Sequence, residues 1–386
     1  MRYFFLFILF LNFDLYSQNS VLDLQILPEE KLYKAKKELQ KKESFYQLAY
    51  RELQSMADSL LSTETRTVMD KDTVPFSGNK HDYLSVGPYW WPNPKTSDGL
   101  PYVRRDGEKN PEIEKITDRK YLDEMMLKVK ALSLAYFYSD DEVYAKKAVE
   151  VIETWFINPE TKMNPHLDYG QAVPGRATGR RYGIIETRAF GILMDYFRLL
   201  ERSSQWKNVE KPLKNWFADY VQWLESSKIG KLEKDEFNNH GTWHDVQAAG
   251  IYLYLGDNEK ASEILKFGLS ERLNSQVEKD GKQPHELART RSFSYSSMNL
   301  YGFLQLYQMA ITSGVEVAPS SVMKLKNAYK YLQPYFNDMK AWKYQQIIKL
   351  NEKNFKVVFL AEELFPSIEK VDVSHIKSPI PTLSFP

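Results

Sequence analysis

The sequence contains no cysteine, so disulfide bonds contribute nothing to its stability. A chain of 386 residues is long enough to be held by an apolar core instead. The chain also has no large excess of either sign of charge, because 52 basic residues balance 51 acidic ones and leave a net charge of +1. Bulk electrostatic binding of nucleic acid needs a basic surface and is therefore disfavoured. The balance still leaves room for a local basic cleft.

Long hydrophobic runs are absent, apart from one at the N-terminus. There Arg2 precedes about ten apolar residues, and the polar pair Ser17-Gln18 follows them. This layout is typical of a secretory signal peptide, and the run is too short to cross a bilayer comfortably. We therefore expect residues 1–18 to be a signal peptide, without a lipoprotein cysteine. The mature protein is expected to be periplasmic or secreted and to have no membrane span.

Helical periodicity dominates the rest of the chain, and strand signals are weak. Short turns such as Ser139-Asp140-Asp141 join neighbouring helices, a pattern typical of antiparallel helical hairpins. No clean internal repeat is present, which disfavours a regular solenoid. The pattern predicts an all-α toroid or barrel, with residues 19–386 as a single domain and a loop-like tail from about residue 366. Helices are predicted at 29–62, 119–139, 142–157, 182–202, 206–227, 243–255, 258–271, 294–313, 319–333 and 353–364.

Three long loops interrupt the helices, at 63–118, 158–180 and 272–292. Loops of this length within a compact domain are usually functional or disordered, and the many aromatic residues of the first loop argue against disorder. In a toroid of helices, the loops at one end line a cleft. Functional residues are therefore expected in these loops and at the adjoining helix ends.

The segment 238–245 crowds two amides, two imidazoles and a carboxylate into eight residues. His240 and His244 stand four apart and would share one face of a helix. This spacing raises the question of zinc, but Gly241 occupies the position where a zincin has glutamate, so no bound metal or other cofactor is predicted. One of the two asparagines is expected to cap the helix. An amide beside a histidine at a helix N-terminus also suits a carboxylate, because this end of a helix is electropositive.

Two arginines precede a tyrosine in the segment 285–295. Arg289 and Arg291 stand six and four residues before Tyr295, so a guanidinium can lie near the phenol. A nearby positive charge lowers a tyrosine pKa and favours the phenolate. A core tyrosine with surface arginines is the alternative interpretation.

Two further loop segments carry candidate binding residues. In the glycine-rich segment 164–181, the guanidinium groups of three arginines suit carboxylates, although a merely solvated loop is the alternative. Without a Lys-Ser/Thr ending, this segment is not a phosphate-binding loop. Just beyond it, Glu186 and Arg188 are close enough in sequence to pair locally. The proline-stiffened aromatic residues of segment 87–94 form either a platform for sugar rings or an anchor to the core.

Four of these segments together resemble one known family. Asn-Asn-His-Gly-Thr-Trp at 238–243 is similar to the signature of the alginate-lyase superfamily of helical polysaccharide lyases. The segments 87–94, 171–176 and 286–295 resemble its other blocks. The resemblance runs from about residue 65 to 335 and is closer to polysaccharide lyase family 38 than to family 5.

The resemblance implies an incomplete (α/α) toroid that cleaves a uronic-acid polymer, either glucuronan or mannuronate-rich alginate. It places Asn239 and His240 at the substrate carboxylate and makes Tyr295 the proton-transfer residue. Arg289 is preferred to Arg291 as the arginine of the site, although the spacing from Arg289 to Tyr295 is one residue shorter than in family 5. The residues expected to bind the anionic polysaccharide are Tyr89, Trp90, Trp91, Gln171, Arg176, Arg180, Arg188, Trp243, His244 and Arg291.

The implied chemistry is syn β-elimination, which leaves a 4,5-unsaturated uronate end. Hydrogen bonds and positive charge on the carboxylate stabilise the enolate-like intermediate. In mannuronate and glucuronate the C5 proton and O4 leave from the same ring face. Tyr295 can therefore act as base and then as acid, and His240 is the alternative base.

Two alternatives belong to other functional classes. A helical glycoside hydrolase would use carboxylates such as Asp168, Glu186 and Asp245, and its products would lack the unsaturated end. A non-catalytic periplasmic glycan-binding protein would use Trp90 and Trp91 and would bind without turnover. The ultraviolet absorbance of the unsaturated product separates the lyase from both.

Overall fold

The computed structural model describes residues 22–41 and 44–386. The signal peptide predicted at residues 1–18 lies outside the described residues. Of the described helices, none combines the length and the apolar character needed to cross a membrane. In chain order the helices are α1 (Glu29–Glu38), α2 (Gln47–Leu61), α3 (Asp118–Ser139), α4 (Glu142–Phe156), α5 (Phe190–Arg198), α6 (Glu210–Ser226), α7 (Lys228–Lys234), α8 (Asn239–Leu255), α9 (Asn258–Phe267), α10 (Leu273–Gln276), α11 (Pro284–Leu287), α12 (Ser292–Thr312), α13 (Pro319–Leu332), α14 (Lys356–Leu364) and α15 (Pro379–Ser384).

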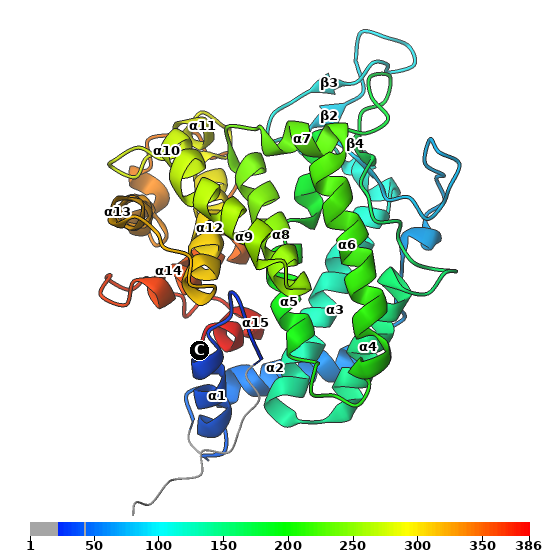
Figure 1. Ribbon diagram of the computed structural model, residues 1–386. Helices are drawn as coiled ribbons and strands as arrows, with labels where there is room; N and C mark the ends of the chain where they lie inside the picture. Colours follow the sequence, from blue (N-terminus) through cyan, green and yellow to red (C-terminus); the bar gives the residue numbers. More distant parts are fainter. Residues whose placement is uncertain (1–21, 42–43) are drawn as a thin grey trace, which may run out of the picture.

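Helical hairpins build the body of the protein (Figure 1), which confirms the predicted all-helical class. Helices α3 and α4, and likewise α8 and α9, are joined by tight turns in which Asp140 and Gly256 adopt the left-handed conformation. Helix α8 packs against α5, α6, α9 and α12 and is buried along nearly its whole length. Because neighbouring helices surround it, α8 has no solvent-exposed polar face. This packing on all sides fixes the position of its first turn.

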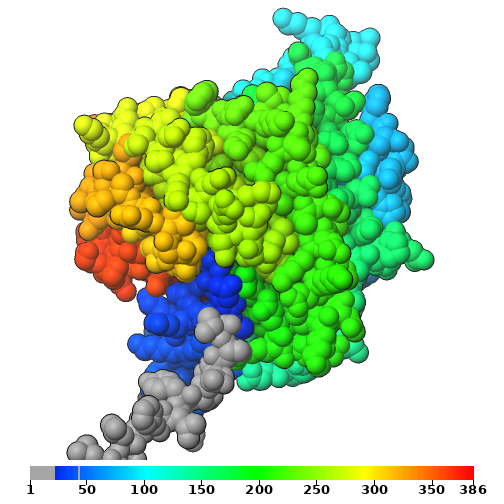
Figure 2. All heavy atoms as spheres, viewed as in Figure 1, coloured from blue at the N-terminus to red at the C-terminus, as the bar shows by residue number. Residues whose placement is uncertain are grey.

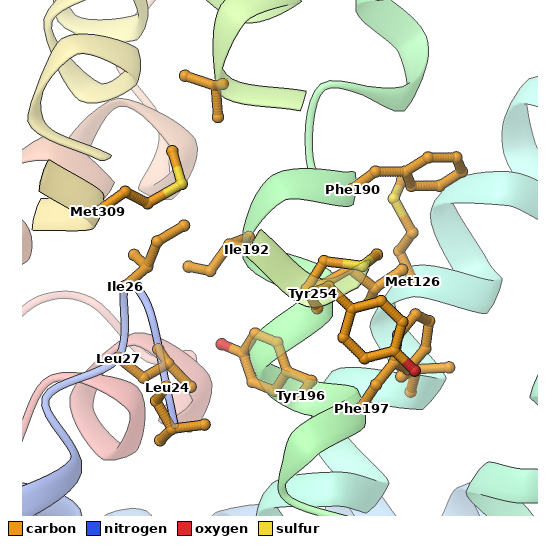
Figure 3. Packing of buried hydrophobic residues seen from close by; sticks show 14 of the residues in the cluster. Leu24, Ile26, Leu27, Met126, Phe190, Ile192, Tyr196, Phe197, Tyr254 and Met309 are labelled. Atoms are coloured by element: carbon orange, nitrogen blue, oxygen red, sulfur yellow. The ribbon is translucent and has the colours of Figure 1, made fainter. Parts of the chain in front are cut away.

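The part of the apolar core that lies between α4, α5, α6 and α8 is dominated by aromatic rings. Phe156 packs edge-on against Trp216 with ring centroids 4.7 Å apart, and Trp216 stacks on Tyr220 at 5.5 Å. Figure 3 shows Phe190 and Phe197 of α5 within the same packing. Rings in these orientations add to the stabilisation from burial itself, so this half of the body forms a rigid support.

The end of the body near both ends of the described chain is sealed by segments from its two extremities (Figure 1). The buried Asp195 carboxylate on α5 accepts backbone N–H groups from Gln25, Ile26 and Leu27, at 2.7–2.9 Å. From the C-terminus comes α15, whose Leu383 carbonyl accepts the Tyr138 hydroxyl at 2.8 Å. The prediction of a loop-like tail from residue 366 was therefore wrong for α15, which buries Leu383.

The opposite end carries the long loops and four short strands. β2 (Trp90–Trp91) pairs antiparallel with β3 (Val103–Arg104), and β1 (Leu84–Val86) pairs parallel with β4 (Tyr169–Ala172). The β2–β3 hairpin protrudes above the helices (Figure 2). Strands of two to four residues are too short to produce an alternating pattern, so the sequence did not predict them.

Several helix boundaries differ from the prediction. The segment 29–62 is two helices, and 182–202 begins with a 3₁₀ segment, Arg181–Thr187, before α5. Helix α7 was not predicted at all. Helix α8 begins at Asn239 rather than at 243, because Asn238 Oδ1 accepts the His240 N–H at 2.9 Å and so caps the helix.

Candidate active site

The first residue of α8, Asn239, is held by a buried carboxylate. Its backbone N–H and its Nδ2 donate to the two oxygens of Glu286 on α11, at 2.7 and 2.8 Å. Burial raises the pKa of Glu286, and the hydrogen bonds from Asn239 oppose this rise. Asn239 Oδ1 is buried without a hydrogen-bond partner among the described residues. The side chain therefore has one orientation, with Oδ1 and the second Nδ2 hydrogen left over for other partners.

The neighbouring His240 is held by a second buried carboxylate. Its Nδ1 lies 2.6 Å from Glu233 Oε1 on α7, and its ring packs edge-on against Tyr182 at 4.9 Å between centroids. A carboxylate at Nδ1 places a proton on that nitrogen, and Nε2 then becomes the acceptor of the neutral ring. This arrangement prepares Nε2 either to accept a proton or, when the ring is charged, to donate to an anion.

Tyr295, in the first turn of α12, meets a tyrosine from the long loop. The hydroxyls of Tyr295 and Tyr89 are 2.6 Å apart, and the guanidinium of Arg289 lies over the Tyr295 ring at 4.2 Å from its centroid. Burial and the contact with Tyr89 raise the pKa of Tyr295, while the charge of Arg289 opposes them. The phenol is consequently the resting form.

The two arginines before Tyr295 differ in their partners. Arg289 forms a forked ion pair with Asp106, with Nη2–Oδ1 at 2.9 Å and Nε–Oδ2 at 3.2 Å. Burial disfavours the Asp106 charge, but the hydrogen bonds and charge of Arg289 outweigh it and lower the pKa of Asp106 to about 2. Arg291 bonds to the Gly107 carbonyl and lies 5.5 Å from the Tyr89 ring centroid, with no carboxylate partner among the described residues. Arg291 is thus the freer of the two cations.

The predicted aromatic platform is lined by arginines. The guanidinium groups of Arg176 and Arg180 lie 5.5 and 5.3 Å from the Trp90 ring centroid, and Arg180 also lies 5.2 Å from Tyr182. Arg180 Nε donates to the Gln171 carbonyl at 2.9 Å, and burial lowers the pKa of Arg180 to about 10. Stacked guanidinium groups keep their N–H edges free for an anion.

The neighbouring Trp91 is held differently, because its Nε1 donates to the Glu108 carbonyl at 3.1 Å and Arg105 lies 4.9 Å from its ring centroid. Its contacts are therefore with the protruding loop, whereas Trp90 faces the arginines around Tyr182.

Comparison with known proteins now decides the family. The family model described as alginate lyase matches residues 67–342, well over half of the chain. The chain belongs to the alginate lyase family. It is accordingly a polysaccharide lyase.

Solved structures agree with this assignment. An alginate lyase from Bacteroides ovatus is 36% identical, with a TM-score of 0.84 over 94% of this chain and 95% of that chain. Alginate lyase A1-III from Sphingomonas species A1 is 12% identical, with a TM-score of 0.52 over 90% and 99% of the two chains. A histidine-to-alanine variant of A1-III complexed with a tetrasaccharide is also 12% identical, with a TM-score of 0.57 over 95% and 96%. The A1-III likeness confirms the (α/α) toroid fold. Among curated proteins, none matches the chain.

Some residues expected to bind substrate in this lyase lie in its interior. Trp243 and His244 are 3% and 2% exposed, because α8 is buried on all sides from its first turn onward. His244 Nε2 faces the Leu224 carbonyl at 3.5 Å. Asn239 in the same helix is 0% exposed, so it differs from these two not in burial but in its place at the first residue of α8 and its contact with Glu286. Arg188 remains partly accessible, with Nη1 donating to the Ile185 carbonyl at 3.0 Å.

The three carboxylates considered for a hydrolase have separate partners. Glu186 Oε2 accepts the hydroxyls of Tyr83 and Ser85 at 2.7 and 2.6 Å. Asp245 is buried in an ion pair with Arg272, and Asp168 accepts the Trp223 indole N–H at 3.0 Å. The part of the chain that the structure describes contains no group of three or more histidines, aspartates and glutamates arranged to hold a metal ion.

Sequence reasoning missed the acids that organise the lyase site: Glu233, Glu286 and Asp106. Glu286 lies within the 286–295 block and could have been noticed there. Glu233 stands seven residues before His240, on a helix that was not predicted, and Asp106 lies 183 residues before Arg289. No local pattern points to such long-range pairs.

Proposed function

We propose that this lyase cleaves a polymer of uronic acids by β-elimination and leaves 4,5-unsaturated ends. The observation that carries the proposal is the place of Glu286, which joins the two halves of the site. It accepts two hydrogen bonds from Asn239, and the charges of Arg289 and His240 both act on it. The carboxylate-holding and proton-transferring residues are therefore neighbours.

In the proposed mechanism, Asn239 and His240 bind the uronate carboxylate. The Asn239 Nδ2 group keeps one hydrogen for this purpose, and the helix N-terminus behind it favours an anion. Arg291 supplies positive charge, since Arg289 is already paired with Asp106. Removing charge from the carboxylate acidifies the C5 proton and stabilises the enolate-like intermediate.

Tyr295 transfers the proton. Its oxygen removes the C5 proton as phenolate and then, as phenol, protonates the departing O4. Arg289 over the ring favours the phenolate, whereas burial and the contact with Tyr89 raise the pKa of Tyr295 and disfavour it. The reactive form is therefore scarce near neutral pH.

The decisive experiment replaces Tyr295 and follows the ultraviolet absorbance of the unsaturated product with alginate blocks, glucuronan, hyaluronan and pectate. Tyr295→Phe should lower elimination by about 10²–10⁴-fold with an unchanged melting temperature. Near-wild-type elimination by this variant would remove Tyr295 from the mechanism. Reducing ends without absorbance, from the wild type, would indicate the hydrolase instead.

Mannuronate-rich alginate and glucuronan both have the stereochemistry that a single proton-transfer residue requires. The Bacteroides ovatus relative is named as an alginate lyase, and the A1-III variants replacing a histidine and a tyrosine are each complexed with a tetrasaccharide. These likenesses support a uronate polymer as substrate. We also propose export by the segment 1–18 and a closer kinship with family 38 than with family 5.

A further inference from the structure

Asp245, the last residue of the polar segment 238–245, is paired with Arg272 in the interior of the protein. Arg272 Nε donates to Asp245 Oδ2 at 2.5 Å, and Nη2 donates to Oδ1 at 3.2 Å. The side chains of Arg272 and Asp245 are 5% and 1% exposed. A buried ion pair adds little stability by itself, because the loss of hydration offsets the attraction between the charges. The other contacts of the guanidinium explain this pair better.

The same guanidinium holds the connection between α7 and α8. Arg272 Nη2 donates to the Lys234 carbonyl at 2.8 Å, and Nη1 donates to the Glu236 carbonyl at 3.0 Å. Four of the five N–H groups of the guanidinium are thereby used. Four residues further along the chain, Gln276 Nε2 donates to the Asn238 carbonyl at 3.0 Å. Together the two side chains hold three alternate carbonyls of the connection.

The local backbone is shaped for this approach of Arg272 to α8. A Cβ at Gly241 would overlap Arg272 Nη1 and would lie 2.9 Å from its Cζ. The glycine in the position where a zincin has glutamate is therefore explained by the passage of the guanidinium. Arg272 itself ends a π-helical turn, Gly268–Arg272, between α9 and α10. Turns of this kind are rare and are frequent at functional sites.

The connection held by Arg272 joins the two partners of the histidine pair. Glu233 lies near the end of α7, and its Oε1 is 2.6 Å from Nδ1 of His240 in the first turn of α8. Helix α7 has only seven residues, and a helix this short depends on external contacts for its position. Within the connection, the Glu236 carboxylate is paired with Arg181. The hydrogen bonds from Arg272 therefore set where both acids stand relative to His240.

We propose that Arg272 is a positioning residue of this lyase, which fixes the α7–α8 connection and, through it, the Glu233–His240 pair. The inference rests on the proposed function, because it takes His240 to act on the reacting sugar. Displacement of a catalytic group by about 1 Å can lower a rate about 100-fold. Lysine at position 272 would keep the charge opposite Asp245, but a single ammonium cannot reproduce the planar fork of the guanidinium.

Arg272→Lys tests this role in the absorbance assay. We expect kcat to fall about 10–100-fold, because His240 is no longer held in the productive geometry. KM for polymer should change less than about threefold, because the arginines beside Trp90 are untouched. The pH profile should shift in the same direction as in Glu233→Gln. A double variant of these two should lose little more than the more severe single variant, because both changes act through His240.

Arg198→Lys is the matched control for the loss of a buried guanidinium. Arg198 is also buried, is paired with Asp23 at 2.9 Å and donates to the Leu253 carbonyl at 3.3 Å, near the opposite end of α8. Its replacement should lower the melting temperature without changing kcat or the pH profile. An unchanged kcat in folded Arg272→Lys, or independent losses in the double variant, overturns the positioning role.

Gly241→Ala provides a second variant if Arg272→Lys does not fold. Alanine is favourable within a helix, and its methyl group would push the guanidinium aside while the charges of the ion pair remain. The same loss of kcat is expected. An unchanged kcat in this variant overturns the positioning role as well.

The state of the His240 ring separates this proposal from the proposed function, because measuring it needs no turnover. NMR of isotope-labelled histidine reports which ring nitrogen carries the proton, and the His240 signals are those lost in His240→Gln. The wild type and Arg198→Lys should carry the proton on Nδ1, and this preference should weaken in Arg272→Lys. Unchanged ring signals in Arg272→Lys overturn the positioning role even if elimination is observed. Failure of every uronate polymer to give unsaturated product, with the ring signals changed, overturns only the proposed elimination.

Discussion

The two sides of the site are built in opposite ways. On the helical side, buried carboxylates hold the polar groups: Glu286 holds Asn239, and Glu233 holds His240, at 2.6–2.8 Å. On the loop side, arginines lie over aromatic rings, and Trp90 has two guanidinium groups near its face. Short hydrogen bonds to buried acids fix one geometry, whereas stacking tolerates sliding. The helical side is therefore suited to chemistry and the loop side to binding sugars of variable position.

Of the substitutions on the helical side, replacement of Asn239 should lower activity the most. Asn239→Ala removes the amide proposed to bind the uronate carboxylate and one of the two hydrogen bonds to Glu286. We expect kcat/KM to fall about 10²–10³-fold in the absorbance assay. Asn238→Ala is the control, because it removes the cap, which costs about 1 kcal/mol of stability, and a hydrogen bond to Glu236, but leaves both hydrogen bonds from Asn239 to Glu286. Equal losses of activity in both variants would contradict the assignment.

Glu233→Gln tests whether the carboxylate matters for orientation. The amide can still accept from His240 Nδ1, but it no longer stabilises a charged imidazole. We expect kcat to fall about 10–100-fold with little change in KM, and the pH profile to shift. Glu259→Gln, exposed on α9, provides the control for removing a negative charge. A normal kcat in Glu233→Gln would make the pair merely structural.

The pH dependence distinguishes the two candidate bases. Because burial and Tyr89 raise the pKa of Tyr295, the phenolate becomes more abundant at every step from pH 7 to 9. The kcat/KM should rise throughout this range, by up to about tenfold per pH unit. A kcat/KM that does not rise over this range would exclude the Tyr295 phenolate and leave His240 Nε2 as the base.

Trp90→Ala should have the smallest effect, because stacking is adaptable. Loss of the indole removes the surface on which Arg176 and Arg180 lie. We expect KM for polymer to rise about 3–10-fold with kcat unchanged. Trp91→Ala should have less effect, since Trp91 contacts Arg105 and the Glu108 carbonyl instead. A fall in kcat for Trp90→Ala would show that the loop side also takes part in chemistry.

Features that depend on neighbouring residues in the sequence, such as helices and their caps, were predicted from the sequence. The all-helical class follows from the hydrophobic periodicity. The cap follows from the type and place of Asn238, a residue suited to capping that directly precedes α8. The partner of Arg289 could not be predicted from the sequence, because Asp106 lies 183 residues earlier and reaches Arg289 only when the long loop folds against the segment before α12. For the same reason the burial of Trp243 and His244 could not be foreseen: it depends on helices that surround α8 in space.

The last helix has a consequence for the order in which the protein can fold. The Tyr138–Leu383 hydrogen bond joins residues 245 apart, and Tyr196 and Ser384 are 188 apart. Docking of α15 on α3 and α5 therefore brings together parts of the chain that are far apart in sequence, and contacts of such separation form slowly. A chain truncated before Pro379 would leave both buried tyrosine hydroxyls without these partners, so α15 satisfies polar groups that lie much earlier in the sequence.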